Sequence, residues 1–425
     1  MRIINAADDR AIARLTSNTR PRNTEVYAEA ARIVADVRQR GDRALTAWAR
    51  RLDGAAPREL TRAELRAGWR ATPREVREAV RTAIAHVRTV AAAERLRPDV
   101  VTVAPGVRIE RRVAPLASVG CYVPGGRYPL PSTLIMTVVP AVVAGVREVV
   151  VVCPKPDATV MCAAVEAGAT RVVQVGGAHA IAALAYGTNM VPRVDKIVGP
   201  GNAWVAAAKT LVSQDCPIDV HAGPSEIVVW SDRGRPEWIA LDLLAQAEHD
   251  PDARAVLVTT RPALARAVAE AVDRRMPADG PAREAIRRRG AIVVATTRRE
   301  AIDVVNRLAP EHLVVDRASD VAAATAAGTV FVGNWSVQAA GDYATGSNHV
   351  LPTGGAARFR GGLTTADFMK TWTVQKLTRQ GLQAIGPAAL TLARAEGLTM
   401  HAASIAARLP NELGGGFNKT ASEAD

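Results

Sequence analysis

Two glutamate–histidine pairs are the residues of this sequence best suited to chemistry. They lie in "AQAEHD" (245–250) and "APEHL" (309–313), and they use two of the seven histidines in 425 residues. In the second pair, Glu311 and His312 fall where a helical pattern ends and a strand pattern begins. Adjacent side chains on an extended backbone point in opposite directions, so both reach one cleft only if the backbone is locally irregular. A histidine at such a place suits a base or a proton shuttle.

The first pair ends an apolar helical pattern over residues 236–250. Gln246 and His249 are three residues apart and therefore share one face of that helix, with Asp242 one turn earlier. A histidine in this position is more often a packed or capping residue than a metal ligand. If the face does bind a metal, glutamine is its poorest donor, and residue chemistry alone favours His249 with a neighbouring acid. Those acids are Asp242, Glu248 and Asp250.

A glycine-rich stretch over residues 333–362 concentrates further polar side chains. Ordering so many glycines is costly in entropy, and a long loop inside a folded protein is usually functional. We therefore expect this stretch to be an active-site loop rather than a connector. Its polar residues include Asp342, Tyr343, Asn348 and His349, and two more candidates, Glu396 and His401, follow near a C-terminal helix.

The elements that must position these residues alternate between strand and helix. Residues 23–97 carry the three- and four-residue apolar spacing of helices, and two series of short apolar strands separated by helices follow from residue 116. Such alternation implies right-handed crossovers and parallel sheets. We expect an α/β fold with two Rossmann-like parallel-sheet lobes, a helical N-terminal part and a helical C-terminal segment.

Three glycine-rich turns follow strands of the first series: "YVPGGRYPLPST", "VGGAH" and "VGPGN". Ligands of open α/β sheets bind at the carboxyl ends of strands, where helix N-termini present backbone N–H groups. None of the three turns is a GxGxxG fingerprint, and each alone could be a folding requirement. Together they favour a nucleotide or another anionic ligand.

Composition excludes several classes of protein. No apolar run approaches the roughly 20 residues of a membrane helix, and the N-terminus lacks the pattern of a signal peptide, so we expect a cytoplasmic protein. The net charge of +12 is spread over helices with interleaved acids, and aromatic residues make up only 4%, so we expect no nucleic-acid partner. The four cysteines show no metal or disulfide spacing and are expected to be buried thiols.

Taken in order, these stretches resemble the histidinol dehydrogenase family, which is NAD- and zinc-dependent. The similarity covers about residues 24–408 and rests on "YVPGGRYPLPSTLIM", "GGAHAIAALAYGT", "GPGNAWVAAAK", "AGPSEI", "LLAQAEHD", "EHL", "GDYATGSNHVLPT" and "EGLTMHAASI". The resemblance implies a four-electron oxidation of an alcohol through the aldehyde to the carboxylate, with two NAD reduced in turn.

The resemblance also implies a role for individual residues. Glu311 and His312 would be catalytic, with His312 as the base and Glu311 positioning water. The implied zinc ligands are Gln246, His249, Asp342 and His401, the last of them supplied by the partner subunit of a homodimer with shared active sites. The implied NAD contacts are Tyr122, His179 and Asn202. The implied substrate contacts are Ser225, Gln246, His249, His312, Asp342, Glu396 and His401, with Ser132 and His349 as weaker candidates.

We expect four segments on this basis. Residues 1–22 would form an N-terminal arm, and residues 23–121 together with 225–363 would form the main α/β domain with the metal and catalytic residues. Residues 122–224 would form the NAD-binding α/β domain. Residues 364–425 would form a C-terminal helical segment that reaches the partner subunit.

Two residues depart from the family pattern. His179 stands where glutamine is usual, and Gln338 stands where many members have an acid. The loss of that acid leaves a second hypothesis open, namely a paralogue that oxidises another small primary alcohol such as a dihydroxypropanesulfonate. A non-catalytic binding protein is a third hypothesis, which the retention of the whole ligand set and of the Glu311–His312 pair argues against.

Overall fold

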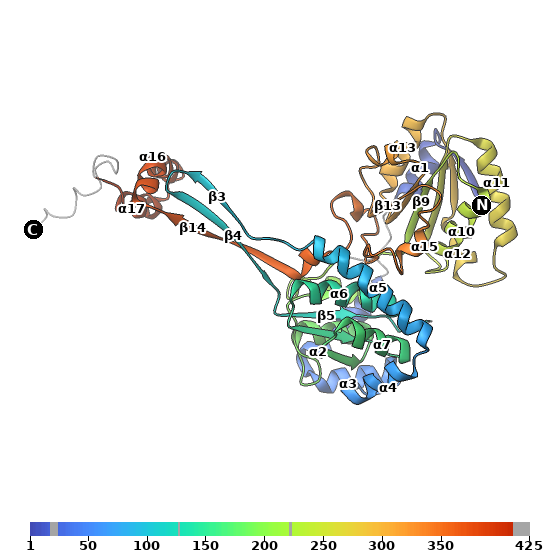
Figure 1. Ribbon diagram of the computed structural model, residues 1–425, viewed down its shortest axis with the longest axis horizontal. Coiled ribbons are helices and arrows are strands. Elements are labelled where there is room, and N and C mark those ends of the chain that lie inside the picture. Colours follow the sequence, from blue (N-terminus) through green and yellow to red (C-terminus); the bar gives the residue numbers. More distant parts are fainter. Residues whose placement is uncertain (18–23, 126–127, 221–222, 411–425) are drawn as a thin grey trace, which may run out of the picture. The chain divides into compact units, whose positions relative to one another are not determined.

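The computed structural model describes residues 1–17, 24–125, 128–220 and 223–410 (Figure 1). The chain divides into two compact units. Unit 1 consists of Met1–Arg95 and Pro115–Phe368, and unit 2 consists of Leu96–Ala114 and Met369–Asp425. In the part of the chain that the structure describes, no helix is both long and apolar enough to cross a bilayer.

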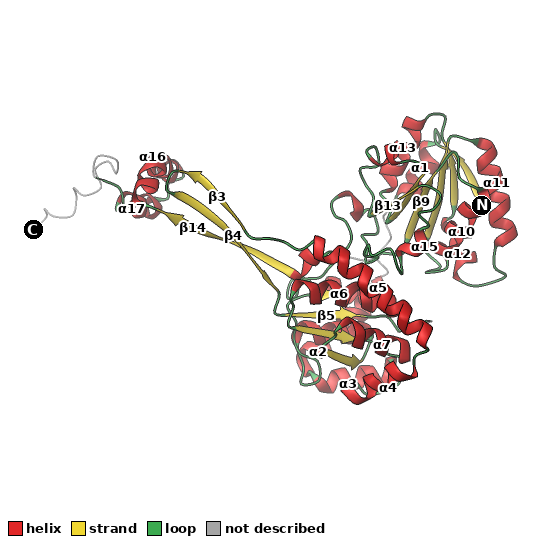
Figure 2. Ribbon diagram, viewed as in Figure 1, coloured by secondary structure: helices red, strands yellow, loops and turns green. Residues whose placement is uncertain are grey.

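The first sheet of unit 1 has six strands in the order β1-β11-β10-β9-β12-β13, and all neighbours in it are parallel. Its strands are β1 (Arg2–Asn5), β9 (Glu226–Trp230), β10 (Arg254–Thr259), β11 (Ala291–Val294), β12 (His312–Val315) and β13 (Thr329–Val332). Helices cover both faces, as Figure 2 shows, so the strands are apolar on both sides. Ile227 and Val229 pack towards one layer of helices, and Val228 and Trp230 pack towards the other.

The helices of this sheet form two layers. One layer contains α10 (Pro236–Ala247), α11 (Pro262–Arg275) and α12 (Pro281–Arg289), and the other contains α1 (Asp9–Thr16) and α13 (Arg298–Leu308). Short helices complete the region: α14 (Ala318–Val321), α15 (Gln338–Gly341), η1 (Ala356–Arg358) and η2 (Thr365–Phe368).

The second sheet of unit 1 has the order β2-β7-β6-β5-β8, with only β2 antiparallel to its neighbour. Its strands are β2 (Arg58–Glu59), β5 (Ser118–Tyr122), β6 (Glu148–Val152), β7 (Arg171–Gln174) and β8 (Ile197–Val198). The helices around it are α2 (Thr24–Arg40), α3 (Asp42–Leu52), α4 (Arg62–Ala71), α5 (Arg74–Ala93), α6 (Pro131–Ala144), α7 (Ala158–Ala167), α8 (Gly177–Tyr186) and α9 (Ala203–Val212). The expected α/β fold with two parallel-sheet lobes and N-terminal helices is confirmed.

The structure groups two segments differently from the expected domain boundaries. Residues 2–5, expected in an arm, form β1 and pair with β11 of the first sheet, whereas residues 18–22 lie outside the described part. Helices α2 to α5, expected with residues 225–363, pack on α6 to α9 instead. Their apolar faces, such as Ile33 and Val37 of α2, are buried in the core of the second sheet.

Unit 2 contains a three-stranded sheet in the order β14-β4-β3 and two helices. Its elements are β3 (Asp99–Ala104), β4 (Val107–Pro115), β14 (Met369–Leu377), α16 (Arg379–Ala395) and α17 (Thr399–Ala406). Leu390, Ala393, Ala402 and Leu409 form its small core. Helices α16 and α17 match the helical segment expected over residues 364–425, but strand β14 at its start and the partner strands from residues 99–115 were not expected.

Candidate active site

The expected catalytic pair, Glu311 and His312, lies at the amino ends of two neighbouring strands. His312 is the first residue of β12 and pairs with Ile227 of β9, directly after Glu226. The backbone N–H of Glu226 donates to the Glu311 carboxylate at 2.8 Å, and His312 Nδ1 lies 3.2 Å from the Glu226 carbonyl oxygen. Glu311 and His312 are 6% and 4% exposed. One residue of β9 therefore holds both side chains of the pair.

The backbone before the pair has the irregularity that the sequence requires. Ala309 ends α13 with a φ of 45°, and it is the one non-glycine residue with positive φ in the described ranges. A left-handed conformation is unfavourable for alanine and is found where the surrounding structure enforces it. This turn brings Glu311 to the strand edge next to His312, whose Nδ1 lies 3.5 Å from the Glu311 carboxylate.

His312 faces a second carboxylate through its other nitrogen. Its Nε2 lies 3.7 Å from Asp342 Oδ1. Burial lowers the pKa of His312, but the carboxylates of Glu311 and Asp342 outweigh burial and raise that pKa to about 10. A proton on His312 is therefore strongly favoured while both neighbouring carboxylates are charged.

Asp342 also meets the end of α10. His249 Nε2 lies 3.9 Å from Asp342 Oδ2, and Gln338 donates to the same oxygen at 3.0 Å. Two atoms that bind one zinc ion at about 2.0–2.2 Å lie roughly 3.4 Å apart, so the His249–Asp342 spacing is close to that of two shared ligands. The neutral Gln338 thus supports Asp342 with an N–H group, where an acid would repel it.

Gln246 is the third expected metal donor. It is 1% exposed, and its amide oxygen has no hydrogen-bond partner among the described residues. A buried polar atom without a partner costs free energy unless something binds it. In the described part of the chain no three His, Cys, Asp or Glu side chains form a metal-binding group, so the fit to a zinc ion depends on this amide oxygen together with His249 and Asp342. The residues present fit a zinc ion.

The remaining expected site residues, the zinc ligand His401 and the substrate contact Glu396, belong to unit 2. Glu396 follows α16 directly, and His401 lies on α17. Both side chains are exposed.

Three further residues were expected to contact the substrate, namely Ser225, His349 and Ser132. Ser225 directly precedes β9, and its carbonyl accepts from the N–H of Arg254. His349 Nδ1 bonds to the backbone carbonyl of Asp342 at 2.8 Å and so helps to position Asp342, one of the expected metal ligands. Ser132 lies in the first turn of α6, and Asn348 of the loop donates to the Met136 carbonyl on the same helix at 2.7 Å.

The "VGGAH" turn differs from the expected anion cradle. The N–H of Gly177 donates to the Tyr122 hydroxyl at 3.1 Å, and the N–H of Gly176 donates to the Asp53 carboxylate at 2.9 Å. His179 is fully buried, and its Nε2 lies 3.0 Å from the same Asp53 oxygen. The N–H groups of Gly176 and Gly177 therefore bond to side chains of the protein. His179 contacts the same Asp53 carboxylate and so helps to hold the turn in place. Asp53 gave no signal in the sequence, because it looks like an ordinary acid at a helix end.

The "VGPGN" turn is built around Gly199. Its φ is 112°, and a Cβ there would lie 2.2 Å from the Tyr122 carbonyl oxygen. Its N–H donates to Asp219 at 2.7 Å, and its carbonyl accepts from Lys209 at 2.9 Å. Lys209 and Asp219 form a buried ion pair beneath the turn. Asn202 is exposed after this turn and caps α9 by accepting from the Val205 N–H, so its amide N–H₂ is left for a ligand.

Comparison with known proteins settles the family. A family model described as histidinol dehydrogenase matches residues 16–409. The chain belongs to the histidinol dehydrogenase family. The Methylococcus capsulatus histidinol dehydrogenase is 42% identical over 412 residues, which are 93% of this chain and 94% of that protein. The Brucella suis histidinol dehydrogenase is 42% identical over 415 residues, which are 93% and 96%.

A solved structure has the same fold. The crystal structure of histidinol dehydrogenase from Elizabethkingia anophelis superposes with a TM-score of 0.91 at 30% identity, covering 96% of this chain and 98% of that one. Members of the family are NAD-dependent oxidoreductases that use zinc, so the expected enzyme class and cofactors are confirmed at the level of the family.

Proposed function

We propose that this protein is a zinc- and NAD-dependent histidinol dehydrogenase that oxidises L-histidinol through the aldehyde to L-histidine. Family membership over residues 16–409 carries the proposal. The meeting of Glu311, His312, Asp342 and His249 at one edge of the first sheet supports it.

The proton chemistry belongs to His312. A carbonyl only accepts hydrogen bonds, so Nδ1 carries the hydrogen that points to Glu226, and Nε2 is the atom that takes up or releases a proton. In the first step Nε2 accepts the alcohol proton while hydride passes to NAD, which gives the aldehyde and NADH. His312 would then release this proton to solvent, and in the second step it would accept a proton from the water that adds to the aldehyde while a second hydride leaves to the second NAD.

Glu311 positions that water, and burial of the pair keeps bulk water away from the aldehyde. A zinc ion held by Gln246, His249, Asp342 and His401 would anchor the nitrogen atoms of the substrate and offset the negative charge next to His312. Ser225 and Glu396 would complete substrate binding, and Tyr122 and Asn202 would contact NAD. We assign His179 a supporting role beneath the NAD turn.

We also propose a homodimer in which each active site receives His401 and Glu396 from the partner chain. The support is that unit 1 gathers three metal donors, whereas the fourth lies exposed in unit 2. We place the protein in the cytoplasm, because all four cysteines are free and buried.

The decisive experiment measures NADH formation by the purified, zinc-loaded protein with L-histidinol and with a panel of small diols and amino alcohols. The proposal expects two NADH per histidinol. Turnover only with another alcohol, such as a dihydroxypropanesulfonate, would contradict the substrate, and turnover with none would contradict the enzyme.

A further inference from the structure

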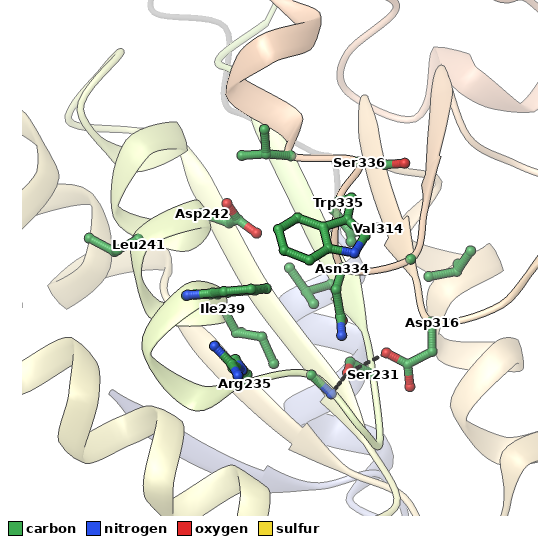
Figure 3. A pocket seen from close by; sticks show the side chains of 16 residues that line it. Ser231, Arg235, Ile239, Leu241, Asp242, Val314, Asp316, Asn334, Trp335 and Ser336 are labelled. Carbon is green, nitrogen blue, oxygen red and sulfur yellow. Dashed lines mark hydrogen bonds between the residues drawn. The ribbon is translucent and has the colours of Figure 1, made fainter.

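The first sheet carries a second hollow at the edge opposite the catalytic pair. A cavity of about 320 Å³ lies at the carboxyl ends of β9 and β12, between α10 and the loop after β13 (Figure 3). From β9 the chain continues to β10 and β11 on one side, whereas β12 and β13 lie on the other. Such a reversal of strand order is where open α/β sheets bind ligands. The catalytic pair uses the amino ends of the same two strands, so this cavity is a separate place.

Two tryptophans form its walls. Trp238 of α10 and Trp335 of the loop have ring centroids 5.7 Å apart, with planes tilted by 54°. Trp335 is 88% exposed, which is unusual for so large an apolar side chain. The Arg235 guanidinium stacks over the Trp238 ring at 4.6 Å, so this ring already attracts a positive group. The floor is apolar and includes Val229 and Val314.

An acid that forms no ion pair with any of the described residues completes the site. Figure 3 shows the Asp242 carboxylate beside the Trp335 ring. Burial raises the pKa of Asp242 to about 6, and no charged neighbour contributes to that change. The other acid of the cavity, Asp316, is already satisfied, because it accepts from the Ser231 hydroxyl at 2.6 Å and from the N–H of Asp232 at 2.8 Å. Asp242 is therefore the group that a ligand would neutralise.

We propose that this cavity binds a small organic cation, an ammonium or imidazolium compound, against the exposed ring of Trp335, which packs on Trp238, with Asp242 as its counter-ion. Aromatic faces next to a carboxylate form the type of cage that recognises such cations. The volume is at the lower end of small-ligand pockets, which excludes a dinucleotide and suits a compound of small-metabolite size.

The test uses choline, whose quaternary nitrogen has no lone pair and therefore cannot coordinate zinc as the nitrogen atoms of histidinol would. Its neutral isostere 3,3-dimethylbutan-1-ol has the same shape without the charge. Titration calorimetry on the full-length, zinc-loaded protein should show saturable binding of one choline per chain and at least tenfold weaker binding of the isostere. Equal binding of the two compounds, or no saturable binding of choline up to roughly tens of millimolar, would overturn the proposal.

Variants locate the site. Trp335→Ala and Asp242→Asn should each weaken choline binding at least tenfold, and Trp335→Phe should retain most of it. Trp372→Ala is the matched control, because Trp372 is a 45% exposed tryptophan of unit 2. Choline binding that survives both Trp335→Ala and Asp242→Asn would overturn the assignment. The alternative is that a second copy of the chain covers Trp335 and the cavity, and light scattering tests it. If Trp335→Ala converts a dimer to monomers and the parent protein binds no choline, this surface is a contact between copies of the chain.

Discussion

Glu226 shows how a single residue can set the chemistry of two others. Its N–H and carbonyl hold Glu311 and His312, and its own side chain is 4% exposed with one carboxylate oxygen that has no hydrogen-bond partner among the described residues. Burial raises the pKa of Glu226 to about 7, and Arg254 at 3.7 Å opposes that rise. The residue that directs His312 Nε2 towards Asp342 therefore acts through its backbone.

Replacing His312 separates catalysis from metal binding. His312→Ala should lower kcat by about 10²–10⁴-fold, because it removes the proton acceptor. Zinc content, measured by elemental analysis after dialysis, should stay at the parent value. Loss of zinc together with activity would show that His312 is a ligand and that our division of roles between His249 and His312 is incorrect.

The candidate site residues that the sequence predicted are those whose neighbours in the chain form a recognisable pattern. Glu311 and His312 stand out because they are adjacent at an element boundary, and His249 stands out on a helix face. Asp53 bonds to His179, which is 126 positions away, and nothing near Asp53 in the chain marks that partner. Side chains that support a turn from a distance are visible only once the fold brings them together.

At the scale of elements, α10 carries Gln246 on its last turn and the cavity wall on its first turns, whereas His249 follows the helix, which ends at Ala247 and not at Asp250 as expected. His249 Nε2 lies 3.9 Å from Asp342 Oδ2, and Gln246 is buried on the last turn of the helix, whereas Glu248 between them is the exposed C-cap residue. Adjacent residues of a helix do not share a face. The acid that makes the "AEHD" sequence conspicuous is therefore not expected to bind the metal.

This difference can be measured. Gln246→Ala and His249→Ala should each weaken zinc binding by at least about tenfold, in line with the loss of a metal donor or of its support. Glu248→Ala is the matched control and should leave zinc affinity unchanged. A competition titration with a zinc chelator gives the affinities, and an effect of Glu248→Ala equal to that of His249→Ala would refute the assigned face.

The buried Lys209–Asp219 pair fixes the turn that precedes α9. Lys209→Met should reduce the free energy of unfolding by about 3–5 kcal/mol, because it leaves Asp219 buried without its partner. Lys209→Met with Asp219→Asn should cost less than the sum of the two single changes, as measured in urea unfolding. Strict additivity would mean that the two side chains do not interact.

Elements with local apolar periodicity were predictable, and elements formed by distant pairing were not. Apart from β1 and β2, the strands of the two large sheets are short apolar runs that the sequence predicted, and the structure confirms them. Strand β3 is exposed along most of its length, and β14 joins β4 across more than 250 residues of sequence. An exposed strand has no one-sided apolar pattern, so nothing in residues 99–115 indicated a sheet.

For the whole molecule, the proposed sharing of sites makes a quantitative prediction. His312→Ala and His401→Ala should each be inactive as pure proteins. When the two are denatured together, refolded and mixed at random, half of the dimers contain one of each chain, and one of their two sites has both histidines. Activity should therefore return to about a quarter of the parent value. No recovery, with dimers shown by light scattering, would mean that each site uses its own His401.

The four buried cysteines make this protein a convenient subject for labelling. Burial raises the pKa of Cys121 and Cys153 to about 12 and that of Cys216 to about 11, and it raises the pKa of Cys162 as well. Alkylating reagents need an accessible thiolate, so the native chain should resist them. A cysteine introduced at exposed Met400 and another at exposed Trp204 would then be the reactive pair for two fluorophores. Energy transfer between them would report the distance between the two labels, without removal of any native cysteine.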